Sequence, residues 1–428
     1  MQELLEEEAK RLGEETGFVR RVSKLSASKF VETLVLGHLE RPDASLNDLV
    51  QVSADLGVAI SVPGLQARIN GQGVKLLEGL LKASLGRMDS RVQLPAAVLE
   101  AFSAVYVLDS SIVTLPAAMQ EQFAGFASTG SEAAIKFQLC YEYKYGNLRA
   151  LEWGAGRCND QSCTLPERLA QPDSLHLADL GYFDQDTFAS LARQGAYFVS
   201  RYKYATNLYA QLKDNQALDL LAVLRQHAGN DYEQRVYLGG RQRVAVRLLC
   251  QRLPEVVVQQ RRRKALAAAR KKGHTCPQAY LELLAWNIFI TNTSPDQLSF
   301  DQVLMIYRLR WQIELLFKLW KSQAHLARLG TARPERILCT LFARLLGLVL
   351  FQALVAPFRV LRTGELSLPK AFQVLQHHAL RLLDSIAAGW RTTPAVLDAL
   401  LTAFTRFALK DKRVSHPSAY SRLLALKS

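Results

Sequence analysis

The chain has 428 residues, and its 53 Lys and Arg against 39 Asp and Glu give a formal net charge of +14. Hydrophobic residues make up 49% and charged residues 21%, a composition typical of folded proteins that excludes a largely disordered chain. The length predicts about two to four domains. The excess positive charge indicates a polyanionic partner, either nucleic acid or an anionic membrane surface.

Neither a secretory signal nor a membrane span is expected. Met1–Gly13 is acidic with a helical pattern, whereas a signal peptide begins with basic and then apolar residues. The longest apolar stretch, Leu345–Phe358, is short for a span and predicts a buried helix. The six cysteines include no CxxC pair, which favours reduced thiols over a zinc site. We therefore expect a cytoplasmic protein with no membrane partner.

The N-terminal 95 residues have a helical pattern. Short helices are predicted for Ser45–Ala54 and Val74–Ser84, with glycine and proline between them. Short helices joined by turns are compatible with a helix-turn-helix module, in which Arg68 and Lys75 would face DNA. A generic helical bundle explains the same pattern equally well.

From Val98 onward, short apolar runs rich in β-branched residues predict strands mixed with helices, and hence an α/β core. The expected strands are Ala104–Leu108, Ala134–Tyr145, Leu175–Ala178 and Ala196–Ser200, with a helix at Gln185–Arg193. Asp109 and Asp179 each end one of these apolar runs. Functional groups gather at the carboxyl ends of strands in α/β sheets, although an aspartate there can also cap a helix or form a turn.

Residues from about 205 to 280 interrupt this pattern. Gln234–Leu238 and Arg243–Leu249 flank Gly239-Gly240, which predicts a β-hairpin. Further on, Arg261–Lys264 and Arg270–Lys272 place seven cations within twelve residues. A solvated helix face and a phosphate-contacting surface explain this basic run equally well.

After a predicted strand at Trp286–Thr291, one long helix is expected over Asp301–Leu326. At about 100° per residue, Tyr307, Arg310, Glu314 and Lys321 fall within an arc of roughly 60° at the edge of the apolar face. A purely structural explanation is an intrahelical pair between Arg310 and Glu314, which would contribute only a few tenths of a kcal/mol.

Asp109, Asp179 and Glu314 are the carboxylates of interest. Three such groups close together would repel one another, and divalent cations remove that penalty. Mg²⁺ and Mn²⁺ prefer oxygen ligands, so no His or Cys cluster is required. Two ions about 3.5–4 Å apart could activate a water or a 3′-hydroxyl and stabilise the leaving oxygen.

Three motifs together resemble those of the insertion-sequence-four family of bacterial DDE transposases. In chain order they are Asp109–Pro116, Ala178–Phe183 and Tyr307-x2-Arg310-x3-Glu314-x6-Lys321, the last being the Tyr-Arg-Glu-Lys signature. The first motif departs from the family at Ser111, where threonine is usual. The resemblance covers about Val98–Leu350 and leaves the N-terminal region without a motif.

The resemblance implies an α/β fold with an RNase H-like catalytic core and a β-rich insertion, flanked by N- and C-terminal helical regions. Asp109, Asp179 and Glu314 would be catalytic and would bind two Mg²⁺ (or Mn²⁺) ions. The expected divisions are a helical DNA-binding region at 1–95, the first part of the core at 96–203, the β-rich insertion at 204–280, the second part of the core with the catalytic helix at 281–350, and a C-terminal helical region at 351–428.

The resemblance also implies the DNA contacts. Arg310 and Lys321 would hold phosphates near the scissile bond, and Tyr307 would contact the same backbone. Trp286 would stack on a base flipped out of the duplex, as a Trp in this neighbourhood does in relatives that form hairpins. A core aromatic is an equally good explanation of Trp286.

The chain is therefore expected to be a DNA transposase that cleaves phosphodiester bonds at insertion-sequence ends and joins them to target DNA. Its partners would be double-stranded DNA, as terminal inverted repeats and target, and a second copy of the chain on that DNA, near the bacterial nucleoid. Two alternatives are a non-catalytic DNA-binding regulator derived from a transposase and a metal-dependent nuclease without strand transfer. Metal-dependent cleavage would exclude the regulator, and product analysis would separate the nuclease.

Overall fold

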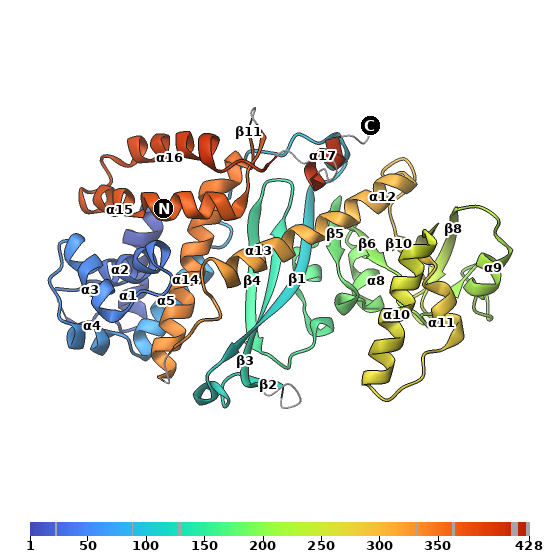
Figure 1. Ribbon diagram of the computed structural model, residues 1–428, viewed down its shortest axis with the longest axis horizontal. Coiled ribbons are helices and arrows are strands. Elements are labelled where there is room, and N and C mark those ends of the chain that lie inside the picture. The colour runs from blue at the N-terminus through green and yellow to red at the C-terminus, as the bar shows by residue number, and fades with distance from the viewer. Residues whose placement is uncertain are drawn as a thin grey trace. The chain divides into compact units, whose positions relative to one another are not determined.

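The computed structural model describes residues 1–21, 24–87, 89–126, 131–330, 333–361, 364–411 and 418–424. It is a mixed α/β structure with a large mixed sheet and many helices, which confirms the predicted class (Figure 1). The chain divides into two compact units. Unit 1 comprises Met1–Pro95, Ser110–Cys158 and Gln312–His416, and unit 2 comprises Ala96–Asp109, Asn159–Trp311 and Pro417–Ser428.

Short helices form the N-terminal part of unit 1, as the sequence predicts. They are the π-helix η1 (Leu4–Glu8), α1 (Ala9–Glu15), α2 (Ala27–Glu40), α3 (Leu46–Asp55), α4 (Val62–Arg68) and α5 (Gly71–Ser84). Serine or asparagine side chains cap the first turns of α2 to α5, satisfying backbone N–H groups that lack partners within the helix. The Arg68 guanidinium lies 4.0 Å from the centre of the Phe18 ring, and its Nε and Nη2 atoms are buried.

The long helix α14 (Pro334–Val355) is the central element of unit 1. It packs against α2 and α5, and Figure 1 shows it in orange beside the blue N-terminal helices. Among the described residues, Pro334–Phe358 alone is long and apolar enough to cross a membrane by length and composition, but 83% of its most apolar window is buried. This burial is that of a core helix and confirms the prediction for Leu345–Phe358. The elements that follow are η7 (Ala356–Phe358), β11 (Val360–Leu361), β12 (Gly364–Glu365), α15 (Leu368–Ala387) and α16 (Thr393–Phe407).

The strands of unit 1 form one end of the sheet. They are β2 (Ala124–Phe126), β3 (Ser131–Glu142), β4 (Asn147–Ala155) and the second half of β1 (Ala104–Leu115), and η2 (Ala117–Met119) follows β1. The order is β2-β3-β1, and β4, which lies off this path, pairs antiparallel with β3.

The strands of unit 2 continue from the first half of β1 in the order β5-β6-β10-β9-β8-β7. Their bounds are β5 (Ser174–Ala178), β6 (Tyr197–Arg201), β7 (Leu208–Tyr209), β8 (Asp231–Leu238), β9 (Val244–Arg252) and β10 (Trp286–Thr291). β1, β5 and β6 run parallel, and β10, β9, β8 and β7 are added antiparallel. The strands predicted at 175–178, 196–200 and 286–291 are thus confirmed.

The segment between β6 and β10 contains the predicted hairpin as β8 and β9, together with three helices, α9 (Leu220–Gln226), α10 (Glu255–Lys271) and α11 (Gln278–Leu283). Its strands share one hydrophobic cluster with the rest of unit 2. Phe188 on α8 (Gln185–Arg193) stacks on Phe198 of β6 at 4.3 Å, and Val246 and Leu248 of β9 belong to the same cluster. The smaller helices of this unit are α6 (Ala97–Glu100), η4 (Asp160–Ser162), α7 (Leu165–Leu169), η5 (Leu180–Tyr182) and α17 (Ala419–Leu424).

The prediction of a single regular helix over Asp301–Leu326 is wrong. The chain forms α12 (Phe300–Tyr307), one 3₁₀ turn η6 (Arg308–Arg310) and α13 (Trp311–Ser322). A 3₁₀ turn has about three residues per turn, so the regular 100° spacing does not run from Tyr307 through to Lys321. The helix also ends four residues early, and beyond it His325 adopts a positive φ of 49° that interrupts the right-handed helical conformation.

Candidate active site

The sheet brings Asp109 and Asp179 together. β1 and β5 are adjacent parallel strands in which Leu108 lies opposite Ala178, so the two aspartates that follow lie side by side. In the next strand, Leu177 of β5 lies opposite Val199 of β6, and the same register continued by two residues places Arg201 level with Asp179. Three charged residues therefore lie in a row across three neighbouring parallel strands of unit 2.

The two aspartates occupy different backbone positions. The prediction that each ends a strand holds for Asp179, which follows β5 and precedes η5. It is wrong for Asp109, since β1 continues to Leu115. Residues Ala104–Leu108 are buried and the strand becomes partly exposed from Asp109 onward, so the apolar run ends where burial ends and not where the strand ends. The Asp109 side chain is 19% exposed and that of Asp179 47%.

Arg310 bridges the two carboxylates. Its Nη1 donates a hydrogen bond to Oδ2 of Asp109 at 3.3 Å, and its Nε lies 4.0 Å from Oδ1 of Asp179. The guanidinium is positioned because η6, which carries it, packs against β5. One positive charge between two carboxylates reduces their mutual repulsion. The residue that the resemblance assigns to a DNA phosphate thus lies beside two of the residues that it assigns to the metal.

Tyr307 lies next to this group, on the last turn of α12. Its ring packs edge-on against Phe289 of β10, with ring centres 5.0 Å apart. Burial, reinforced by the negative charge of Asp179, raises the pKa of Tyr307 to about 12, against the opposing charges of Arg310 and Arg201. The hydroxyl is therefore protonated at neutral pH and available as a donor. Among the described residues, this buried hydroxyl has no hydrogen-bond partner of normal geometry.

Glu314 and Lys321 follow on α13 and belong to unit 1. Glu314 is half-buried, and Lys321 is exposed in the last turn. The described part of the chain contains no group of three or more His, Cys, Asp or Glu side chains that could hold a metal ion. Two of the three predicted carboxylates are thus adjacent within unit 2, and the third lies on the helix that continues from Arg310.

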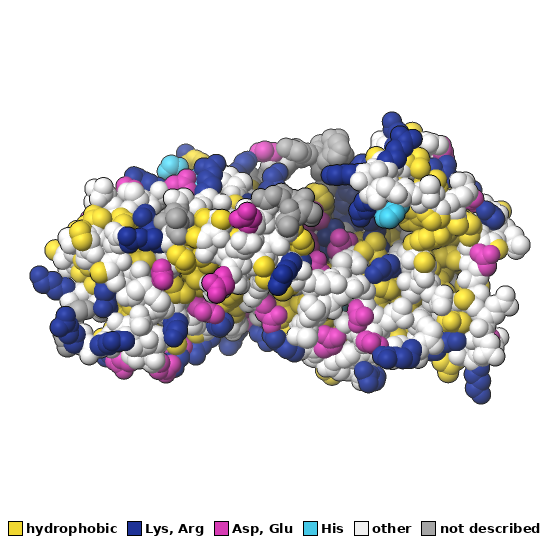
Figure 2. Space-filling view, turned by 90° about the horizontal axis from the view of Figure 1, so that it is seen from below, with side chains coloured by type: hydrophobic (Ala, Val, Ile, Leu, Met, Phe, Trp, Pro, Cys, Tyr) yellow, Lys and Arg dark blue, Asp and Glu magenta, His cyan; other side chains and the backbone are white. Residues whose placement is uncertain are grey.

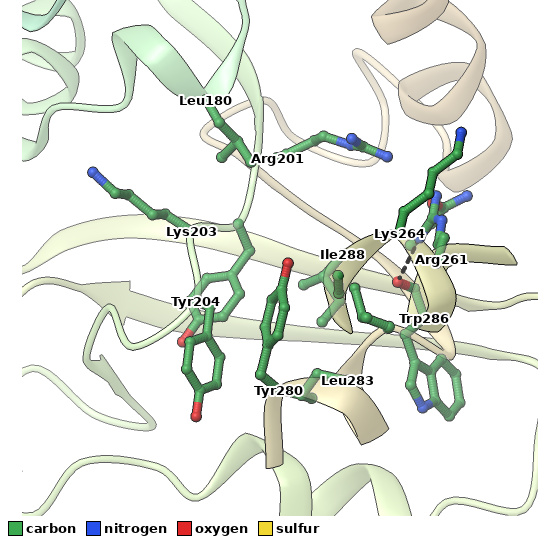
Figure 3. A pocket seen from close by; sticks show the side chains of 14 residues that line it. Leu180, Arg201, Lys203, Tyr204, Arg261, Lys264, Tyr280, Leu283, Trp286 and Ile288 are labelled. Atoms are coloured by element: carbon green, nitrogen blue, oxygen red, sulfur yellow. Dashed lines mark hydrogen bonds between the residues drawn. The ribbon is translucent and has the colours of Figure 1, made fainter. Parts of the chain in front are cut away.

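A cavity of about 540 Å³ opens in unit 2 beside Arg201. Figure 3 shows Arg201, Lys203 and Lys264 around a group of aromatic side chains. Trp286 lines this cavity and is also 6% exposed in the hydrophobic cluster, with the Arg252 guanidinium 4.9 Å from its ring centre. Trp286 is therefore a core residue with one side toward a cavity, which combines the two explanations that the sequence offers.

Sequence reasoning missed Arg201 and two tyrosines of this cavity. Tyr204 and Tyr280 lie side by side with ring centres 5.0 Å apart, at an interplanar angle of 56° (Figure 3). No local pattern joins two residues so far apart in the chain. Arg201 did have a signal, because it follows a predicted apolar strand just as Asp109 and Asp179 follow theirs.

With this geometry established, comparison with known proteins identifies the family. Residues 100–350 match the family model described as the transposase DDE domain, which is more than half of the chain. The chain belongs to this family. Its matched segment contains Asp109, Asp179, Arg310 and Glu314.

Curated relatives agree over nearly the whole length. The chain is 27% identical to the transposase for insertion sequence element IS231B of Bacillus thuringiensis subsp. berliner, over 97% of this chain and 91% of the relative. It is 26% identical to the transposase for IS1151 of Clostridium perfringens, over 98% and 94%. A solved piggyBac transposase synaptic complex with hairpin DNA gives a TM-score of 0.48 at 11% identity, covering 96% of this chain and 84% of that one, a likeness too weak to define the fold.

Proposed function

We propose that this member of the transposase DDE family cleaves phosphodiester bonds at the ends of an insertion sequence and joins those ends to target DNA. The observation that carries the proposal is the pairing of Asp109 and Asp179 on adjacent parallel strands, with Arg310 between them, inside the matched segment. The resemblance of the three motifs supports our proposal that the chain belongs to the insertion-sequence-four group of that family.

The donor set fits hard divalent cations. Asp109, Asp179 and Glu314 offer carboxylate oxygens, which Mg²⁺ and Mn²⁺ prefer, and we propose that they hold two such ions. Bound there, the ions would supply an activated water or 3′-hydroxyl and neutralise the leaving oxygen. Glu314 would complete the site from α13.

The remaining residues would position the DNA. Arg310 already lies beside both aspartates, so an arriving phosphate could accept the hydrogen bond that this guanidinium now donates to Asp109. Tyr307 would donate its buried hydroxyl to a neighbouring backbone oxygen. Lys321, exposed in the last turn of α13, would contact another phosphate. Most of the lowering of the barrier would come from positioning and charge neutralisation.

The cavity beside Arg201 would receive an unstacked base at the element end. Trp286, Tyr204 and Tyr280 provide aromatic surface, and stacking on such surface contributes about 1–3 kcal/mol per base and tolerates any sequence. Arg201 and Lys203 would hold the adjoining phosphates.

The strand order supports an RNase H-like core. An antiparallel pair, β3 and β4, lies to one side of β1, and the parallel strands β5 and β6 lie to the other. The segment 204–280 would then be an insertion that extends the sheet, 1–95 a DNA-binding region and 351–428 a C-terminal region. The site of action would be the bacterial nucleoid within the cytoplasm.

Holding two ends together requires a homodimer formed on DNA. Analytical ultracentrifugation of the protein with and without end DNA tests this point. Two protein copies per complex under cutting conditions are expected, and a strictly 1:1 complex would contradict the proposal.

The activity is tested by incubating the protein with a duplex of its own element end, with Mg²⁺ or with EDTA, and resolving the products on a denaturing gel. Cleavage at the element boundary in the sample with Mg²⁺, and not in the sample with EDTA, excludes a non-catalytic regulator. Transfer of the cut end to a target plasmid excludes a simple nuclease. Asp179→Asn should abolish both products, whereas the exposed control Asp296→Asn should retain them.

A further inference from the structure

A second cavity, of about 480 Å³, lies in unit 1 between the loop before α3 and the first turns of α14. Three arginines line it, Arg328, Arg336 and Arg344, together with a single carboxylate, that of Asp43. With His38 neutral, the lining carries three positive charges and one negative, a net of +2. No proposed catalytic residue lines this cavity.

Arg344 is built into the wall of the cavity. Its side chain is only 4% exposed, and it donates hydrogen bonds to the carbonyl oxygens of His325, Arg328 and Pro42 at 2.6–2.8 Å. Its Nε is also buried and has no hydrogen-bond acceptor among the described residues. Carbonyl dipoles therefore provide most of the compensation for the charge of this guanidinium. The Arg344 guanidinium would attract an anion in the cavity even without direct contact.

The lone carboxylate is already engaged. Asp43 accepts a hydrogen bond from Nδ1 of His325 at 2.6 Å and lies 3.5 Å from Nη1 of Arg328 and 3.7 Å from Nη2 of Arg344. It therefore offsets one arginine and leaves the rest of the positive charge facing the cavity.

Arg336 is the arginine of this cavity for which the described part of the chain offers no acceptor. It is half-buried on the first turn of α14, and none of the described residues forms an ion pair or hydrogen bond with it. Burial, together with the positive charges of Arg344 and Arg336, lowers the pKa of the neighbouring His38 to about 3. A half-buried guanidinium without an acceptor, beside a second buried one, is an arrangement that a doubly coordinating oxyanion stabilises.

We propose that this cavity binds a phosphate group, and that in the working protein the phosphate belongs to the DNA backbone outside the cleavage site. Arg336 and Arg328 would contact the phosphate directly, and Arg344 would contribute positive charge from the wall of the cavity. The assignment to DNA rests on the proposed function, since inorganic phosphate has the same chemistry. Net charge alone would not have located the site, because Lys and Arg side chains are scattered over the face drawn in Figure 2.

The test compares Arg336→Gln with Arg381→Gln, a matched loss of one charge at an exposed position on α15 of the same unit. Binding to a duplex of the element end is measured in EDTA over a range of salt concentrations. Arg336→Gln should weaken binding by about tenfold or more and make the logarithmic salt dependence shallower by about 0.9, the loss of one phosphate contact. Arg336→Lys keeps the charge and should recover most of the salt slope. Urea unfolding of each variant checks that the fold is intact.

A parallel arm measures thermal stabilisation by inorganic phosphate against chloride at equal ionic strength. If Arg336→Gln binds DNA like Arg381→Gln but loses stabilisation by phosphate, the site stands and its ligand is free phosphate. If neither measurement separates the two variants, the proposal is overturned. Because binding is measured without metal, a wild-type protein that binds through Arg336 but never cleaves would contradict only the proposed function. Equal DNA affinities and equal stabilisation by phosphate in the two variants, together with normal cleavage, would contradict only the phosphate site.

Discussion

Replacing Tyr307 with phenylalanine should stabilise the protein while impairing its chemistry. The hydroxyl is buried and has no hydrogen-bond partner of normal geometry among the described residues, and the ring packs on Phe289 in a way that phenylalanine can preserve. A buried donor left without an acceptor costs about 1–3 kcal/mol. Because 8% of the residue is still exposed, Tyr307→Phe should raise the free energy of unfolding by about 1 kcal/mol, the lower end of that range.

The same change should slow cleavage. If the Tyr307 hydroxyl donates to a charged phosphate oxygen in the DNA complex, losing that bond costs about 1.5–3 kcal/mol, or a factor of roughly 10–100 in rate or affinity. Urea unfolding in EDTA without DNA measures stability, and single-turnover cleavage of end DNA measures the chemical effect.

Tyr202 provides the matched control. Its hydroxyl donates to the Thr206 carbonyl at 2.6 Å, and burial raises its pKa to about 12 as for Tyr307. Tyr202→Phe should therefore lower the free energy of unfolding, by about 1 kcal/mol. Destabilisation by Tyr307→Phe as large as that by Tyr202→Phe, or cleavage by Tyr307→Phe at the wild-type rate, would contradict these expectations.

Three further predictions concern other parts of the molecule. Asp179→Asn should weaken Mn²⁺ binding measured by calorimetry, whereas unchanged affinity would remove this residue from the metal site. Burial lowers the pKa values of His38 and His176 to about 3. Their neutral forms therefore stabilise the fold above pH 6.5, the pKa of an unperturbed histidine. That contribution to the free energy of unfolding, up to about 5 kcal/mol for each histidine, is lost as the pH falls toward 3. In urea titrations His176→Gln should flatten this pH dependence, and an unaltered slope would contradict the assignment. Phe198→Ala should cost about 3–5 kcal/mol, since the ring is fully buried and stacked on Phe188, and a loss under 1 kcal/mol would show that the cluster collapses around the gap.

Much of the core could be predicted because its signals are local. Apolar β-branched runs gave the strands at 175–178, 196–200 and 286–291, and the Gly239-Gly240 turn gave the β8–β9 hairpin. Asp109 and Asp179 were singled out because each follows such a run, and parallel pairing then places them together.

The errors arose where non-local packing decides the conformation. Asp109 ends an apolar run, yet β1 continues past it because neighbouring β3 extends the sheet. The 3₁₀ turn at Arg308–Arg310 could not be predicted from the sequence, because the helical periodicity of apolar residues is nearly the same on both sides of the turn. Tyr204 and Tyr280 meet only through the folding of the segment between β6 and β10, which no local pattern encodes.

Glu314 tests the central claim most directly, because it is the one predicted metal ligand that lies on α13 and not in the aspartate pair. Wild type, Glu314→Ala and the exposed control Glu121→Ala should be incubated with end DNA in Mg²⁺, and affinity for the same DNA should be measured in EDTA. The account predicts cleavage by wild type and Glu121→Ala, none by Glu314→Ala, and similar DNA affinity for all three. Cleavage by Glu314→Ala at the wild-type rate would contradict a catalytic site built from Asp109, Asp179 and Glu314.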